Sequence, residues 1–299
     1  MQLTSIPVEK RFPLTLRQSI SSIRELYEVG KEQRWVPHQD INWDALDFSG
    51  LDEETRRAAS LTWSRRAWIE YASLTETPAL LVRLCLEAGR ESDPKYFLTV
   101  RNTEEAWHIE CCHRYAKALG GYIDRPSEKS MESVFNQNRY RKVLDAKCHT
   151  DAFLMVHAAF EDNLELVLYR AYLLNAVEPV ARRILEQFVQ AKERHVEFGW
   201  LYAHERSALW TDTDRQAIAE ALRDHLLQVE LRGYHCPWLA DPGGAEARAL
   251  AITTKAGLGA ISAAEEQQVF EANLEDMQAR LAELGVSLDL SGIIPLTRD

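Results

Sequence analysis

The sequence predicts an all-α protein built on four long helices. Four long segments have helical periodicity, at 52–89, 94–119, 151–176 and 178–207. No stretch alternates apolar and polar residues over several turns, as a half-buried strand would. The segments form two close pairs with a longer connection between them, so we expect a four-helix bundle.

Residues 1–52 are predicted to form an arm that precedes the bundle. The arm contains a short amphipathic helix at 16–27, with Gly30 as its predicted stop. The first long helix follows, and either Ser49 or Asp52 can cap it. The arm therefore ends where the bundle begins.

The remaining elements follow in order. Pro78 interrupts the first long helix, and we expect a kink or a break at about Thr77, because proline removes a backbone donor and clashes one turn back. A more polar helix is predicted at 128–146, and two further helices at 212–231 and 263–284. We divide the single predicted domain into the arm at 1–52, a helical core at 53–208, and C-terminal helices at 209–299 packed on that core.

Composition narrows the class of protein. The net charge of -11 is spread along the chain, which disfavours nucleic acid as a partner because phosphate binding needs a concentrated basic surface. No apolar run approaches the roughly 20 residues of a membrane span. The N-terminus lacks the basic start and apolar core of a signal peptide, so we expect a soluble cytoplasmic protein. The five cysteines show no paired spacing and are predicted to be core thiols.

One motif carries chemistry of its own. Glu105 and His108 are three residues apart, so on a helix they share a face and can bind one cation. Bundle-borne dimetal sites take such a pair from each of two helices and a lone Glu from each of two others. Glu70, among apolar and aromatic neighbours, is a candidate for one lone Glu. A buried carboxylate needs a partner or a metal, because burial without one is costly.

On the third and fourth helices the pattern is less complete. Glu161 ends an apolar run and is the candidate from the third helix, although Glu161, Asp162 and Glu165 could equally form one solvated face. His195 is the candidate from the fourth. Its expected glutamate partner, three residues earlier, is replaced by Lys192.

The order of these candidates resembles the ferritin-like dimetal-carboxylate superfamily, which includes ribonucleotide reductase small subunits, bacterial monooxygenase hydroxylases and arylamine N-oxygenases. The resemblance covers about residues 60–205. The two paired motifs in that superfamily often read Asp-Glu-x-Arg-His. Here the first keeps both ligand types, with Glu104 in the Asp position and Trp107 in the Arg position. The second keeps Arg and His and loses both acids. Cys112 stands where many reductase subunits have tyrosine, so a stored tyrosyl radical is not expected.

The resemblance implies a ferritin-like four-helix bundle and a dioxygen-activating non-haem diiron-type oxidoreductase or oxygenase. Such an enzyme would act on a small organic substrate by hydroxylation, N-oxygenation or oxidative cleavage. The implied metal ligands are Glu70, Glu105, His108, Glu161 and His195, with Lys192 as the catalytic candidate. Two iron ions are expected, with one ion or manganese as the alternatives, and dioxygen is the co-substrate. The chain shows no nucleotide-binding glycine motif or cluster-binding cysteines, so electrons must come from an external reductase or ferredoxin. A homodimer is compatible with bundles of this kind.

Lys192 leaves three interpretations open. The amine could be deprotonated by burial and act as a ligand or a reactive group. Glu193 or Glu197 could instead supply the missing oxygen through a π-type distortion of the helix, or His157 could contribute. The site could also have decayed to one metal or none, with Lys192 in a salt bridge to Glu161 or Glu70. The alternative function is then a metal-poor or metal-free bundle that binds a ligand or a partner protein.

Overall fold

The structure confirms the all-α prediction. It is a computed structural model, and it describes residues 6–9, 12, 19–137, 139–294 and 296. Within these ranges the regular elements are all helical, apart from an isolated bridge between Ala176 and Leu258. None of the helices in the same ranges is both long and apolar enough to cross a lipid bilayer.

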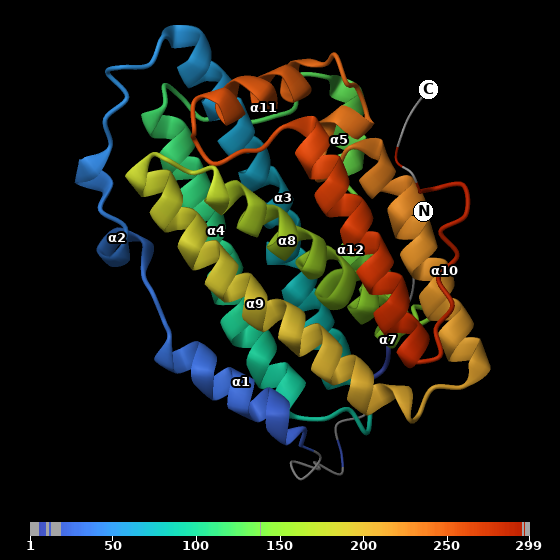
Figure 1. Cartoon of the computed structure of the whole chain (residues 1–299). Coiled ribbons are helices and arrows are strands. Elements are labelled where there is room, and N and C mark those ends of the chain that lie inside the picture. The colour runs from blue at the N-terminus through green and yellow to red at the C-terminus, as the bar shows by residue number, and fades with distance from the viewer. Residues whose placement is uncertain (1–5, 10–11, 13–18, 138, 295, 297–299) are drawn as a thin grey trace.

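Four long helical stretches run side by side through the molecule (Figure 1). They are α3 (Glu53–Leu86), α4 (Asp93–Ala118), the run from α7 (Thr150–Leu154) through the π-helix η2 (Met155–Glu161) to α8 (Asp162–Leu174), and α9 (Pro179–Ser207). α3 packs along α4, α8 packs along α9, α9 packs back against α4, and α7 at the start of the third stretch contacts α3. The bundle is therefore closed, and the side chains at its centre are shielded from water.

The arm before the bundle contains α1 (Ser21–Glu32), α2 (Pro37–Asp40) and the 3-10 turn η1 (Trp43–Ala45). The helix expected at 16–27 begins later, and residues 16–18 lie outside the described residues. The predicted stop at Gly30 is wrong, because α1 continues to Glu32. A Cβ on Gly30 would lie 3.1 Å from Val100, so this glycine allows α1 to approach α4 closely.

Of the kink or break expected at about Thr77, the break is wrong, since α3 continues through Pro78 without interruption. Proline inside a helix costs about 3 kcal/mol. α3 nevertheless buries residues on both sides of the proline, including Ser73 and Leu80, and packs along α4. We infer that this tertiary packing offsets the local cost.

The C-terminal helices cover the bundle. They are α10 (Asp212–Gln228), α11 (Ala245–Lys255) and α12 (Ala263–Glu283), with the 3-10 turns η3 (Glu230–Arg232) and η4 (Pro237–Leu239) after α10. α11 packs on α3, α12 on α8 and α10 on α7 (Figure 1). α11 was not predicted, and the helix expected at 128–146 is divided into α5 (Lys129–Phe135) and α6 (Arg139–Leu144).

Side-chain caps fix where several helices start. Asp52 accepts a hydrogen bond from the Thr55 amide at 2.7 Å and begins α3, as one of the two predicted caps. Glu178 accepts from two backbone amides at the start of α9, and α10 and α12 begin with capping boxes. Each such cap stabilises its helix by about 1 kcal/mol.

The π-helix η2 is held directly against α9. A Cβ on Gly199 would overlap the carbonyl of Ala158, so only glycine allows the two backbones to lie this close. π-helical segments occur often at functional sites. This one changes the register of the third long helix immediately before Asp162.

Asp151 ties the start of α7 to the end of α9. Its carboxylate accepts a hydrogen bond from the Trp210 indole at 2.9 Å and forms ion pairs with Arg90 and Arg206. Burial raises the pKa of Asp151, but the two arginines more than offset this, and the net pKa is below its ordinary value. The group is therefore charged and paired in the folded protein at neutral pH.

We predict that Asp151→Asn lowers the free energy of unfolding at pH 7 by about 3 kcal/mol, because Arg90 and Arg206, both partly buried, lose the buried anion that they share. The folded pKa is depressed, so this stabilisation is present above the ordinary value of 3.8 and is lost as the pH falls through the folded pKa. Urea denaturation of wild type and variant between pH 7 and pH 3 measures the difference. Asp124→Asn, at an exposed aspartate, is the control. A difference that stays constant over this range would contradict the prediction.

Candidate metal centre

Five of the six predicted site residues converge inside the bundle. Glu70 comes from α3, Glu105 and His108 from α4, and Lys192 and His195 from α9. Each is 0% exposed to solvent. The structure thus brings together side chains that are more than a hundred positions apart in the sequence.

Glu70 and His108 lie next to each other, on neighbouring helices. His108 Nδ1 is 3.2 Å from Glu70 Oε2, and the Tyr169 hydroxyl donates to Glu70 Oε1 at 2.6 Å. The other ring nitrogen of His108, Nε2, has no hydrogen-bond partner among the described residues. In the second paired motif, the position of the motif's aspartate is occupied by Ala191, which has no carboxylate.

Glu105 is held by one oxygen only. Its Oε1 accepts hydrogen bonds from Arg101 Nε at 2.8 Å and from the Thr77 hydroxyl at 3.1 Å. Its Oε2 is buried, and no described residue pairs with it. Arg101 is itself fully buried and lies 3.1 Å from Asp162.

His195 is oriented by Glu104, which stands in the position of the aspartate in the first paired motif. Its Nε2 is 2.9 Å from Glu104 Oε2, and Glu104 also pairs with Arg194. Its Nδ1 has no hydrogen-bond partner in the described ranges and lies 3.8 Å from Asp162 Oδ1. Burial, with Arg101 nearby, lowers the pKa of His195 well below its ordinary value, so the ring is neutral. A neutral imidazole that gives Nε2–H to Glu104 presents a free lone pair on Nδ1.

Lys192 lies among three carboxylates. Its Nζ is in direct contact with Glu165 Oε2, 3.4 Å from Asp162 Oδ1 and 3.5 Å from Glu70 Oε2. Burial lowers the pKa of Lys192, but these acids more than offset the effect and hold it above its ordinary value. The geometry matches a charged ammonium in salt bridges, one of the interpretations left open above, with Asp162 and Glu165 as partners in addition to Glu70.

Glu193 and Glu197, the other candidates for the missing ligand oxygen, do not reach the carboxylates around Lys192. Glu193 is about half exposed and pairs with Arg170 at 2.7 Å. Glu197 lies on the same exposed face of α9. The helix distortion that could have turned them inward is found in η2, on the third helix, instead.

The structure places Glu161 apart from the other five predicted residues. It faces Arg139 at 2.7 Å and His157 at 3.4 Å, while Asp162 and Glu165 face Lys192. The cause is η2, which ends at Glu161 and shifts the register of the residues that follow. From here on, the four acids around Lys192 and Arg101, namely Glu70, Glu105, Asp162 and Glu165, are called the carboxylate cluster.

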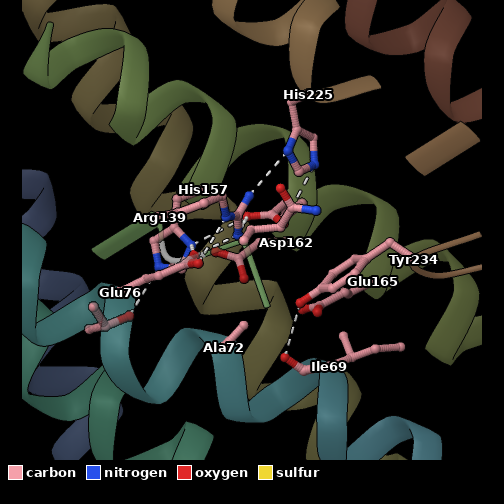
Figure 2. A network of polar contacts seen from close by, with 12 residues as sticks. Ile69, Ala72, Glu76, Arg139, His157, Asp162, Glu165, His225 and Tyr234 are labelled. Atoms are coloured by element: carbon pink, nitrogen blue, oxygen red, sulfur yellow. Dashed lines mark hydrogen bonds and ion pairs between the residues drawn. The ribbon is translucent and has the colours of Figure 1, made fainter. Parts of the chain in front are cut away.

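Arg139 is the centre of a second polar network beside the carboxylate cluster (Figure 2). Its guanidinium donates to Glu76 and Glu161, at 2.8 and 2.7 Å, and lies 3.1 Å from His225 Nδ1. Two triplets here, Glu76–His157–Glu161 and Glu161–His225–Glu230, have the spacing of metal ligands. The guanidinium already binds Glu76 and Glu161, so the position of a cation is taken.

The second network reaches the carboxylate cluster through the C-terminal segment. Glu230 is fully buried between His225 Nε2 at 2.9 Å and His235 Nδ1 at 2.7 Å, and His235 Nε2 is 3.3 Å from Glu165 Oε1. Burial lowers the pKa of His235, but Glu230 and Glu165 raise it to about 10. The charged ring therefore supports Glu165 from the side opposite Lys192.

Among known proteins, the chain is similar to solved structures. No family model matches the chain, and no curated protein matches it. An R2-like ligand-binding oxidase variant with an aerobically reconstituted Mn/Fe cofactor superposes with a TM-score of 0.65 at 16% identity, over 86% of this chain and 93% of the other. The same oxidase after photoconversion also gives 0.65, at 17% identity, over 86% and 92%. The chain has the fold of the R2-like ligand-binding oxidases. At this identity the likeness establishes the ferritin-like helical fold.

Sequence reasoning missed several residues of the site. Arg101 lies four residues before Glu105 and so on the same helix face, a spacing that could have revealed it. Asp162 and Glu165 entered the sequence analysis only as members of a possible solvated face with Glu161, and not as site residues. Glu230 carries no spacing signal at all, because a turn rather than a helix brings it to the histidines.

The donor atoms and charges fit one divalent ion of the kind that R2-like ligand-binding oxidases contain. The carboxylate cluster has four formal negative charges, and Lys192 and Arg101 supply two positive ones. The positive charge of His235 beside Glu165 is balanced by Glu230, 2.7 Å from it. One divalent ion would balance the remainder. Carboxylate and imidazole donors suit iron and manganese. Four buried donor atoms lack hydrogen bonds within the described residues: Glu105 Oε2, His108 Nε2, Asp162 Oδ2 and His195 Nδ1, of which Asp162 Oδ2 forms an ion pair with Arg101 at 3.1 Å.

We predict that Lys192→Met destabilises the metal-free protein by about 3–5 kcal/mol, because three buried carboxylates lose their cation. Denaturant unfolding in the presence of a chelator measures this loss. The loss should be smaller with excess manganese, since a divalent ion can replace the missing charge. Lys117→Met, at an exposed lysine of α4, is the matched control and should change stability by less than about 0.5 kcal/mol. Equal stability of Lys192→Met and wild type in chelator would contradict the burial of an ammonium here.

Proposed function

We propose that this protein is a metal-dependent, dioxygen-activating oxidase or oxygenase that acts on a small organic molecule. One observation carries the proposal: buried carboxylate and imidazole donors from four helices converge, and some of their atoms have no hydrogen-bond partner in the described part of the chain. Such atoms are costly to bury unless something binds them. The similar solved structures are described as oxidases with a Mn/Fe cofactor, which supports the same reading.

Glu105, Asp162 and His195 would hold the ion. Glu105 offers its unpaired Oε2, and His195 offers Nδ1 on the side facing Asp162. Glu70 and His108, whose side chains lie 3.2 Å apart, would form the second metal position. Iron or manganese, when bound, supplies the redox chemistry and the open coordination positions that dioxygen requires.

The protein's own residues prepare the site. Glu104 keeps the proton of His195 on Nε2 and so leaves Nδ1 open. Lys192 holds Glu70 and Glu165 together in place of a ligand glutamate. Closure of the bundle, with the Phe188 ring 4.1 Å from the His108 ring, excludes water from the donors. Electrons would come from a separate reductase or ferredoxin.

A second candidate function is a metal-free bundle that binds a ligand or a partner protein. The observation that favours it is the presence of two buried cations, Lys192 and Arg101, among the acids that would otherwise bind metal. Metal binding separates the two candidates.

We expect the purified protein, reconstituted anaerobically with ferrous or manganous ion, to bind about one ion per chain, the number that balances the cluster. Elemental analysis measures the ratio, and an oxygen electrode with a chemical reductant measures dioxygen consumption by the iron form. His195→Ala should lose the ion and the consumption, while His204→Ala, at an exposed histidine of α9, should keep both. No bound metal in the wild type after reconstitution would favour the metal-free bundle.

Lys192→Glu tests the charge argument directly. It replaces a positive charge by a negative one, a swing of about two charges beside the ion position, and should raise occupancy from about one to about two ions per chain. Elemental analysis again gives the ratio, with Lys117→Glu as the control. Unchanged occupancy in Lys192→Glu would show that this residue does not limit metal binding.

A further inference from the structure

An aromatic-lined pocket lies outside the carboxylate cluster, between α3 and the segment that joins α4 to α6. Its volume is about 590 Å³, within the range of small-molecule sites. None of the residues of the carboxylate cluster lines it. The aromatic residues in its wall are Trp68, Tyr71, Tyr122, Phe135, Tyr140 and Tyr234.

The wall is fixed by packing and hydrogen bonds. The Phe135 ring centroid is 5.6 Å from that of Trp68 and 5.5 Å from that of Tyr234, so the three rings form one continuous surface. The Trp68 indole donates to the Ile123 carbonyl at 3.0 Å, and the Tyr234 hydroxyl donates to the Ile69 carbonyl at 3.3 Å (Figure 2). A wall that is already ordered costs little entropy when a ligand binds.

The charges in the pocket disfavour an anion. Glu76, Asp124 and Glu132 line it together with two cations, Arg125 and Arg139. The guanidinium of Arg139 at the floor is already committed to Glu76 and to the rest of its own network. A ligand carboxylate would therefore meet more negative than positive groups.

We propose that this pocket binds a neutral, planar aromatic molecule of one or two rings that carries one hydrogen-bonding group, such as a phenol or an aryl amine. Its rings pack against the surface formed by Trp68, Phe135 and Tyr234. The hydroxyls of Tyr71 and Tyr122 in the lining can hydrogen-bond its polar group. The site does not depend on a metal, so it extends beyond the proposed oxidase function.

A short polar chain connects the floor of this pocket to the carboxylate cluster. Glu76 Oε2 is 3.3 Å from His157 Nδ1, His157 Nε2 is 3.1 Å from the Thr77 hydroxyl, and that hydroxyl donates to Glu105 at 3.1 Å. Glu76 in the pocket lining is therefore three contacts away from Glu105, a proposed ligand. The pocket lies beside the site and is not isolated from it.

A matched pair of probes tests the charge argument. 2-Naphthol and 2-naphthoate have the same ring system but differ in charge at pH 7. Isothermal titration calorimetry with the full-length protein should show 2-naphthol binding at least about tenfold more tightly than 2-naphthoate. Equal affinities, tighter binding of 2-naphthoate, or no binding of 2-naphthol would overturn the proposal. The metal-loaded and metal-free proteins should behave alike, so this test is independent of the oxidase proposal.

A blocking variant locates the site. Ala72 lies in the pocket lining, and Ala72→Trp should fill the space and weaken 2-naphthol binding at least about tenfold. Val82→Trp, at an exposed position of α3 outside the pocket, should leave binding unchanged. Thr75→Trp, at an exposed lining position, serves if Ala72→Trp lowers the melting temperature. Retained 2-naphthol binding in a folded blocking variant would place the ligand elsewhere and refute the assignment.

Discussion

The buried ammonium of Lys192 is the interaction on which the centre of this molecule depends. Its Nζ contacts acids from α3 and α8, and no water reaches it, since Lys192 is 0% exposed. A buried charge is tolerated only when it is paired, and removing one partner leaves the others uncompensated. α3, α8 and α9 are therefore linked by electrostatics as well as by apolar packing, and any metal in this bundle must bind beside a positive charge.

The π-helix η2 decides which acids face that charge. By ending at Glu161, it sends this carboxylate toward Arg139 and leaves Asp162 and Glu165 directed at Lys192. Gly199 permits this arrangement, because α9 lies directly on the Ala158 carbonyl and a Cβ at this position would overlap it. One local change of register thus separates two polar networks that would otherwise compete for the same acids.

Much of this arrangement was predictable from the sequence, but not all of it. Regular 3.6-residue patterning gave the long helices, and the spacing of Glu105 and His108 placed both on one buried face. Glu161 could not be placed, since a π-helix has no recognised sequence signature in an apolar run such as 155–160 and depends on the contact with α9. The course of α3 through Pro78 was equally hidden, because packing along α4 rather than local propensity decides it.

The C-terminal segment shows why the bundle core alone does not define the site. Glu230 is fully buried because it pairs with His225 and His235 at once, and His235 then reaches Glu165. The positive charge on His235 and the ammonium of Lys192 stabilise Glu165 as an anion from opposite sides, and burial of the acid would be costly without them. A residue that lies outside the four long helices therefore sets the charge state inside them.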